Sequence, residues 1–337
     1  MPIICPKSVP EDEILDRTLR PRNFDDYQGQ SKTKESLKIL IQAAKKRGEP
    51  IEHLLLSGAS GLGKTTLAHI IANETKSSIK ATSGAAIERV GDLGSILTNL
   101  SDGDILFVDE AHRLNKMIEE VLYPAMEDFR LDIVIGKGPS ARTLQLDLPK
   151  FTLIAATTRP ALLSSPLRSR FGLSFRLDFY ETEDIKKIVE RSSKILNIEI
   201  DHDAASDIAC CSRFTPRVAN RLLKRVRDFA QVRGSGKITR GIVKEAFKML
   251  EIDVLGLEPI DRQILSIIAE KFDGGPVGLQ ALAAATCEDE DTITDVYEPY
   301  LMRIGFLLRT PRGRMATKEA FAHLSLKFPE PAQKKLL

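Results

Sequence analysis

Short apolar runs alternate with longer amphipathic stretches through the first half of the chain. The runs at 54–56, 105–108 and 151–156 have the length and composition of strands that are buried on both faces of a parallel sheet. Turns marked by glycine and proline separate these runs from the amphipathic stretches. The pattern predicts an α/β fold, with a doubly wound parallel sheet domain over residues 1–180.

The second half of the chain shows a helical period instead. Apolar residues recur at three- and four-residue spacing between 181 and 253, which indicates a small helical lid domain. The helices are expected at 183–196, 203–211, 216–233 and 239–250.

Residues 254–337 combine three short helices with a hairpin. Alternation in the hairpin, at 305–317, resumes at Met315 and Ala316 after a Pro/Gly turn. This order is typical of a C-terminal winged-helix domain that binds DNA.

A second hairpin is expected at about 131–148, inside the sheet domain. Two alternating stretches flank a Gly/Pro turn, and they are surplus to a doubly wound core. Their apolar side chains need cover, which a partner or the domain itself could provide: Ile133, Ile135, Leu144 and Leu146.

The first apolar run leads into a phosphate-binding loop, Gly58-Ala59-Ser60-Gly61-Leu62-Gly63-Lys64-Thr65. In this pattern backbone N–H groups and a helix N-terminus bind phosphate, the lysine reaches the β/γ oxygens and the hydroxyl ligates Mg²⁺. We therefore expect ATP and Mg²⁺ as cofactors. The expected contacts in this segment are Gly61, Gly63, Lys64, Thr65 and Thr66.

The second run ends in two acids, Asp109 and Glu110, where a parallel sheet presents its carboxyl edge. Asp109 is expected to hold Mg²⁺ together with Thr65, and Glu110 to polarise the attacking water. The alternative is a solvated acidic pair at a strand end.

The sequence Asp109-Glu110-Ala111-His112 also matches the acidic box of helicases with two recombinase-like lobes. Those enzymes need an arginine motif in a second lobe, and this sequence contains none. Instead, the third run ends in Thr157 and Thr158, and Arg170 and Arg217 follow in the steps Ser-Arg-Phe and Thr-Pro-Arg.

These residues, in this order, resemble the AAA+ ATPases. The resemblance implies a first sensor at Thr157 or Thr158, with Thr158 in the catalytic set, and a second sensor at Arg217. It also implies that Arg170 is an arginine finger that completes the site of a neighbouring subunit. An ion pair at a helix end is the alternative for Arg170.

Within that class the chain is similar to the RuvB family of Holliday-junction branch-migration motors. The similarity runs from about residue 19 to 323 and includes 19–30, 120–128 and 309–317. Two departures are Ala59-Ser60, where the family usually has two prolines, and Ala111, where it has isoleucine; every expected ligand stays in place.

The resemblance implies an ATP-driven ring, a hexamer, that translocates duplex DNA and moves Holliday junctions during recombination and repair. RuvA is the expected partner of the 131–148 hairpin, and RuvC is a further partner. Six more nucleotide contacts are implied: Leu19, Arg20, Glu127, Asp128, Phe129 and Tyr180.

Charge distribution supports a DNA contact at the C-terminal end. The net charge is only +2, yet from Arg303 onward eight bases face two acids. Arg309, Arg312 and Arg314 in the hairpin are expected to contact DNA phosphates, with a solvated basic hairpin as the alternative.

The cysteines and the hydropathy of the chain indicate where in the cell the protein is expected. The four cysteines have no metal-ligand spacing, and no apolar run has the length of a membrane span. We expect reduced thiols, no membrane contact and a cytoplasmic location.

Two other functions remain open at this level. A clamp-loader-type ATPase would share the arginine finger but carry a helical collar in place of the basic hairpin. A nucleotide-gated DNA-binding regulator would bind one specific sequence and would not need Glu110.

Overall fold

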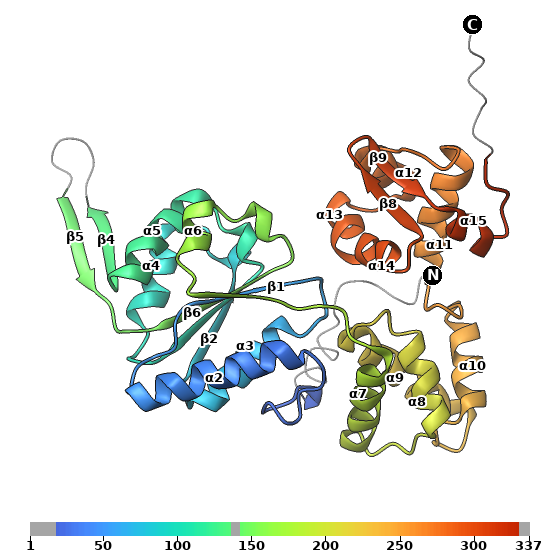
Figure 1. Cartoon of the computed structure of the whole chain (residues 1–337), viewed down its shortest axis with the longest axis horizontal. Coiled ribbons are helices and arrows are strands. Elements are labelled where there is room, and N and C mark those ends of the chain that lie inside the picture. Colours follow the sequence, from blue (N-terminus) through green and yellow to red (C-terminus); the bar gives the residue numbers. More distant parts are fainter. Residues whose placement is uncertain (1–17, 136–141, 330–337) are drawn as a thin grey trace, which may run out of the picture. The chain divides into compact units, whose positions relative to one another are not determined.

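The computed structural model describes residues 18–135 and 142–329. These residues form two compact units, divided at about residue 184 (Figure 1). We call residues 18–184 the nucleotide unit and residues 185–329 the C-terminal unit. In the part of the chain that is described, no helix is long and apolar enough to cross a membrane.

A five-stranded, fully parallel sheet in the order β2-β3-β6-β1-β7 forms the centre of the nucleotide unit. The predicted α/β class and the three predicted strands are confirmed. The strands are β1 (Leu54–Ser57), β2 (Ile79–Ser83), β3 (Ile105–Asp109), β6 (Thr152–Thr157) and β7 (Leu173–Arg176). The helices are α2 (Ser31–Arg47), α3 (Lys64–Thr75), α4 (Val90–Thr98), α5 (Lys116–Glu127) and α6 (Ser165–Ser169).

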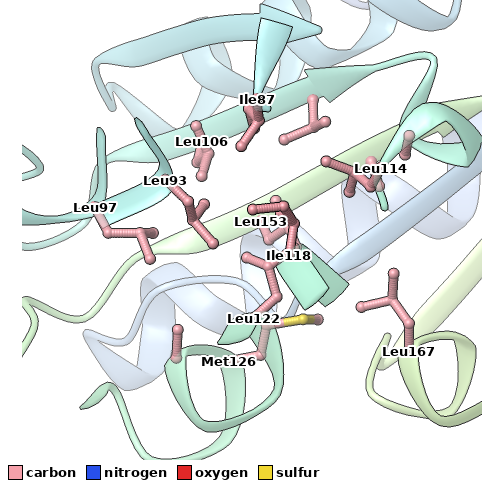
Figure 2. Packing of buried hydrophobic residues seen from close by; sticks show 14 of the residues in the cluster. Ile87, Leu93, Leu97, Leu106, Leu114, Ile118, Leu122, Met126, Leu153 and Leu167 are labelled. Atoms are coloured by element: carbon pink, nitrogen blue, oxygen red, sulfur yellow. The ribbon is translucent and has the colours of Figure 1, made fainter. Parts of the chain in front are cut away.

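Alternate residues of the strands pack on opposite faces of the sheet. Leu106 and Leu153 meet Leu93, Ile118 and other apolar side chains of α4, α5 and α6 on one face (Figure 2). Helix α3 contacts β3 and β6, and α2 packs on α3 on the other side (Figure 1). Burial on both faces explains why these strands are continuous apolar runs.

The predicted internal hairpin is present as a separate two-stranded antiparallel sheet. Strands β4 (Arg130–Ile135) and β5 (Arg142–Asp147) pair in a register that sets Leu131 opposite Leu146. Leu131 is fully buried, whereas Leu144 is 46 % exposed. The turn at 136–141 lies outside the described residues.

The four predicted lid helices are found with ends that differ by at most one residue from the prediction. They are α7 (Thr182–Ile195), α8 (His202–Cys210), α9 (Pro216–Arg233) and α10 (Arg240–Met249). Proline at the first position of α9 and Thr239, whose hydroxyl accepts from Ile242 N before α10, fit the preferences of helix N-termini.

The winged-helix elements follow. They are α11 (Pro259–Ser266), a π-helical turn at Ile267–Lys271, α12 (Leu279–Thr286), α13 (Glu290–Thr292), a π-helical turn at Ile293–Tyr297, α14 (Glu298–Arg303), β8 (Leu307–Thr310), β9 (Gly313–Ala316) and α15 (Lys318–His323). The β8–β9 hairpin, which we call the wing, pairs Leu307 with Ala316 and Arg309 with Arg314. The predicted hairpin is thus confirmed.

Candidate functional site

The phosphate-binding loop joins the carboxyl end of β1 to the first residue of α3. Gly58 has a φ of 145°, and a Cβ atom there would lie 2.6 Å from the carbonyl oxygen of Leu177, so only glycine fits. Lys64 is buried, and its ammonium donates to the carbonyl oxygens of Gly58 and Ala59 at 2.8 and 2.9 Å. The lysine therefore braces the loop at the first turn of α3.

Thr65 and Asp109 meet across the sheet, as the expected magnesium site requires. The Thr65 hydroxyl donates to Asp109 Oδ2 at 2.9 Å, and Asp109 Oδ1 accepts from the backbone N–H of Glu110 at 2.9 Å. Mg²⁺ prefers hard oxygen ligands such as a hydroxyl and a carboxylate, so the side chains of Thr65 and Asp109 fit the ion as metal ligands. Thr66 lies in the first turn of α3.

One histidine, His112, lies between Glu110 and the end of β6. Glu110 Oε2 is 3.3 Å from Nε2 of His112, and Nδ1 of His112 is 3.0 Å from Oγ1 of Thr157, the last residue of β6. The Thr158 hydroxyl is also buried, and it has no hydrogen-bond partner within the described residues. Both threonines predicted as sensors therefore lie at the edge of the sheet that carries Asp109.

Two buried tyrosines, Tyr27 and Tyr180, lie beside the phosphate-binding loop. Tyr180 Oη lies 3.0 Å from Tyr27 Oη and 3.2 Å from the carbonyl oxygen of Leu62. Burial raises the pKa of Tyr27 to about 12 and raises the pKa of Tyr180 as well, so both remain neutral hydrogen-bonding groups. Leu19, another predicted nucleotide contact, is buried, and Arg20 beside it is half-buried.

Arg170 forms a cluster of its own with α5. Its guanidinium stacks 4.3 Å above the Tyr123 ring, donates to Glu127 Oε2 at 3.2 Å and donates to the carbonyl oxygen of Pro166 at 2.9 Å. The predicted contacts Arg170 and Glu127 thus lie together, at the C-terminal ends of α6 and α5.

This cluster belongs to the edge of the sheet opposite the phosphate loop. Two residues after Arg170, the Gly172 N–H donates to His53 O, just before β1 begins. Phe129 packs edge-on against Phe151, just before β6 begins. Since the loop follows the carboxyl end of β1, the two backbone regions are separated by the length of that strand, about 10 Å. Glu127, Asp128 and Phe129 therefore lie toward the start of β1, and the phosphate loop toward its carboxyl end.

Arg217, the predicted second sensor, lies in the C-terminal unit. It is exposed in the first turn of α9, directly after the Pro216 that begins the helix.

One predicted DNA contact is placed differently from the expectation. Arg309 and Arg312 are exposed, but Arg314 is only 7 % exposed because its Nε donates to Glu298 Oε1 at 2.5 Å and its Nη2 to Glu298 Oε2 at 3.3 Å. Arg314 therefore differs from the expected phosphate contact, since its guanidinium fastens the wing to α14.

Sequence reasoning gave no role to His112 or Tyr27. The signal for His112 was present, because a histidine three residues after Asp109, the expected metal ligand, returns to the same strand end. Nothing local marks Tyr27, whose partner Tyr180 is 153 residues away.

Family models for all three parts match this chain. The Holliday junction DNA helicase RuvB P-loop domain matches residues 19–177, the RuvB AAA lid domain matches 180–253, and the RuvB C-terminal winged helix domain matches 254–325.

Relatives match over nearly the whole chain. The Holliday junction branch migration complex subunit RuvB of Dehalococcoides mccartyi (strain CBDB1) is 60 % identical over 326 residues, which cover 97 % of this chain and 93 % of that protein. The subunit of the same name from Thermomicrobium roseum is 58 % identical over 328 residues, with the same coverage. The solved structure of the Thermotoga maritima RuvB Holliday junction branch migration motor has a TM-score of 0.86 at 49 % identity and covers 93 % of this chain and 100 % of that one. With its phosphate loop, lid and winged helix all matched, the chain belongs to the RuvB family of AAA+ ATPases that drive branch migration of Holliday junctions.

Proposed function

We propose that the Thr65–Asp109 pair holds Mg²⁺ and that ATP binds on the loop above it. The phosphates would be contacted by Gly61, Gly63 and Lys64. The rest of the nucleotide would be contacted by Leu19, Arg20 and Tyr180. The bound ion would supply charge neutralisation to the β- and γ-phosphates. The observation that carries the proposal is the 2.9 Å bond between Thr65 and Asp109, which brings the two expected metal ligands together.

Glu110 follows Asp109 directly, and we assign it as the base that orients and deprotonates the attacking water. Thr158 would read the γ-phosphate from the end of β6, because its buried hydroxyl lacks a partner among the described residues. Arg217 would act as the second sensor. The chain would then divide into three functional parts, residues 1–180, 181–253 and 254–337.

Arg170 would complete the site of a neighbouring subunit in a head-to-tail ring, with six subunits as the expected number. The support is geometric, since the Arg170–Glu127 cluster and the phosphate loop lie at opposite edges of one sheet. A heterologous contact between unlike edges closes into a ring when the rotation permits. Glu127, Asp128 and Phe129 would then approach the neighbour's nucleotide.

The exposed Arg309 and Arg312 of the wing would hold DNA phosphates while ATP turnover sets direction. Branch migration exchanges equivalent base pairs, each stacking step being worth about 1.4 kcal/mol, so little net work is needed per step. The β4–β5 hairpin, with its exposed Leu144, would dock on RuvA, and RuvC would join the complex in the cytoplasm.

The test is ATP turnover by the full chain with circular duplex DNA and RuvA. Glu110→Gln should keep affinity for a fluorescent ATP analogue and lose turnover by about 10²- to 10⁴-fold, the usual contribution of a general base. Lys64→Ala should instead weaken nucleotide binding itself. Normal turnover by Glu110→Gln would refute the assignment of the base.

A further inference from the structure

His112 is almost completely enclosed between the proposed base and the sensor strand. Its side chain is 6 % exposed, and its two ring nitrogens face different partners. Nε2 lies 3.3 Å from Glu110 Oε2, and Nδ1 lies 3.0 Å from Thr157 Oγ1. The imidazole therefore connects the end of β6 to the Glu110 carboxylate.

The surroundings of Thr157 determine which ring nitrogen carries the proton. Thr157 is fully buried, and its Oγ1 already accepts from the backbone N–H of Arg159 at 3.0 Å. A buried hydroxyl donates its own hydrogen, and His112 Nδ1 is the acceptor beside it. A neutral imidazole that accepts at Nδ1 carries its hydrogen on Nε2, which then faces the carboxylate of Glu110. The opposite tautomer would direct a lone pair at a negative charge.

The backbone of Glu110 is fixed independently of its side chain. Glu110 has a φ of 49°, and its N–H is held by Asp109 Oδ1. Gly84 packs against it so closely that a Cβ atom there would lie 2.5 Å from the Glu110 carbonyl oxygen. With the main chain held in this way, the orientation of the carboxylate depends on what its side chain touches.

We propose that His112 is a positioning residue that holds the Glu110 carboxylate and links its orientation to the end of the sensor strand β6 through Thr157. A shift of Thr157 and Thr158 would then change the orientation of the Glu110 carboxylate through the His112 ring, without a change in the main chain. The proposal rests on the assignment of Glu110 as the base, and it adds a residue that acts through Glu110 and not on the nucleotide.

Three substitutions of His112 distinguish the contact at Nε2 from the contact at Nδ1. Measured from Cβ, a glutamine amide reaches the place of Nε2, whereas an asparagine amide reaches only that of Nδ1. His112→Gln should therefore keep turnover within about threefold of the parent chain, and His112→Asn and His112→Ala should lower kcat by about tenfold, which is about 1.4 kcal/mol in the barrier. Affinity for the fluorescent ATP analogue should stay within about twofold in all three, since no phosphate contact is removed.

Thr157 supplies the second arm of the test. Thr157→Val removes the hydroxyl that fixes the imidazole tautomer, so it should lower kcat by about tenfold in the parent chain. The loss should be smaller in the His112→Gln background, where the amide N–H faces Glu110 without help from Thr157, and Thr157→Ser should lower kcat less than Thr157→Val. Equal kcat values for the Gln, Asn and Ala variants of His112 would overturn the proposal.

A double-mutant comparison tests the route through Glu110. In the Glu110→Gln background the carboxylate is already absent, so adding His112→Asn should leave the residual turnover unchanged. A further tenfold loss there would show that His112 acts elsewhere and would overturn the proposal. The failure of the base assignment gives a different result, normal turnover by Glu110→Gln alone.

Discussion

Arg213 and Asp261 form a buried ion pair between the lid and the winged helix, with Nη2 2.5 Å from Oδ2 and Nη1 3.4 Å from Oδ1. Arg213 lies in the loop between α8 and α9, and Asp261 in the first turn of α11. Glu258 accepts from Arg221 of α9 at 2.5 Å and lies 3.3 Å from Arg213 Nη2. The two parts therefore share a single set of buried charges.

Apolar contacts support the same junction. Phe214 packs against the core of the winged helix, and its ring lies 6.2 Å from that of Tyr300. Arg213 Nε also donates to the carbonyl oxygen of Gly256 at 3.1 Å. Since α9 begins two residues after Phe214 and carries Arg217, we expect α9 and the winged helix to move as one body.

Removal of one partner of the Arg213–Asp261 pair should lower the stability of the C-terminal unit. Asp261→Ala in the full chain should lower the free energy of unfolding of the C-terminal unit by about 3 kcal/mol, because it leaves the Arg213 guanidinium buried with less compensation. Urea denaturation with a probe in the C-terminal unit measures the change. The control is Asp201→Ala, whose ion pair with Lys237 is 42 % exposed on both sides and should therefore contribute much less. Equal losses in the two variants would contradict the prediction.

The same carboxyl should make stability depend on pH. Burial raises the pKa of Asp261 from 3.8 to about 6, against the opposing effect of Arg213. As pH rises from about 4 to about 6, the unfolded chain releases this proton before the folded chain does, so the free energy of unfolding falls. Below and above that pH range, Asp261 does not change the free energy of unfolding with pH. The difference between the parent chain and Asp261→Asn, followed by urea denaturation at several pH values, should show this slope. A flat difference would exclude it.

The parts of the site that follow from local patterns were predictable. The phosphate loop, the acids at the end of β3 and the ends of the lid helices depend on short-range spacing, and each lies where the sequence predicts. Arg213 and Asp261 are 48 residues apart, and His112 and Thr157 are 45 apart, so their pairing depends on how distant elements pack. Arg309 and Arg314 read alike in the sequence, yet proximity to Glu298 on α14 buries only Arg314.

Mixed subunits test whether Arg170 acts on a neighbour. Arg170→Ala subunits keep an intact phosphate loop, and Lys64→Ala subunits keep an intact arginine finger. In a mixed ring the complete interfaces are therefore those at which an Arg170→Ala subunit supplies the loop and a Lys64→Ala subunit supplies the finger. With equal amounts and random assembly, about one quarter of the interfaces pair a loop with a finger, and ATP turnover should recover to about that fraction of the parent value. Steady-state turnover measured across mixing ratios, with assembly confirmed by light scattering, decides the question. Absence of recovery at every ratio would place Arg170 in its own subunit's site.

The wing offers a comparison between two kinds of arginine. Arg309 and Arg312 are exposed, so each can bind a DNA phosphate and release counterions, whereas the Arg314 guanidinium is engaged with Glu298. Arg309→Ala and Arg312→Ala should each weaken binding about equally for unrelated duplexes and reduce the slope of log K against log salt by about 0.9. The exposed Lys244 of α10 provides the control, and Lys244→Ala should leave the slope unchanged.

Arg314→Ala should behave differently from both. It leaves the buried Glu298 carboxylate unpaired, so it should destabilise the wing by about 3 kcal/mol or more in urea denaturation. Glu298→Gln separates stability from DNA contact, because it disrupts the same pair while the arginine charge remains. If Arg314 only fastens the wing, Glu298→Gln and Arg314→Ala should reduce stability together, and the salt slope measured under conditions where each variant is fully folded should stay at the parent value. A slope that falls by about 0.9 in Arg314→Ala but not in Glu298→Gln would show that Arg314 leaves its carboxylate and binds phosphate directly.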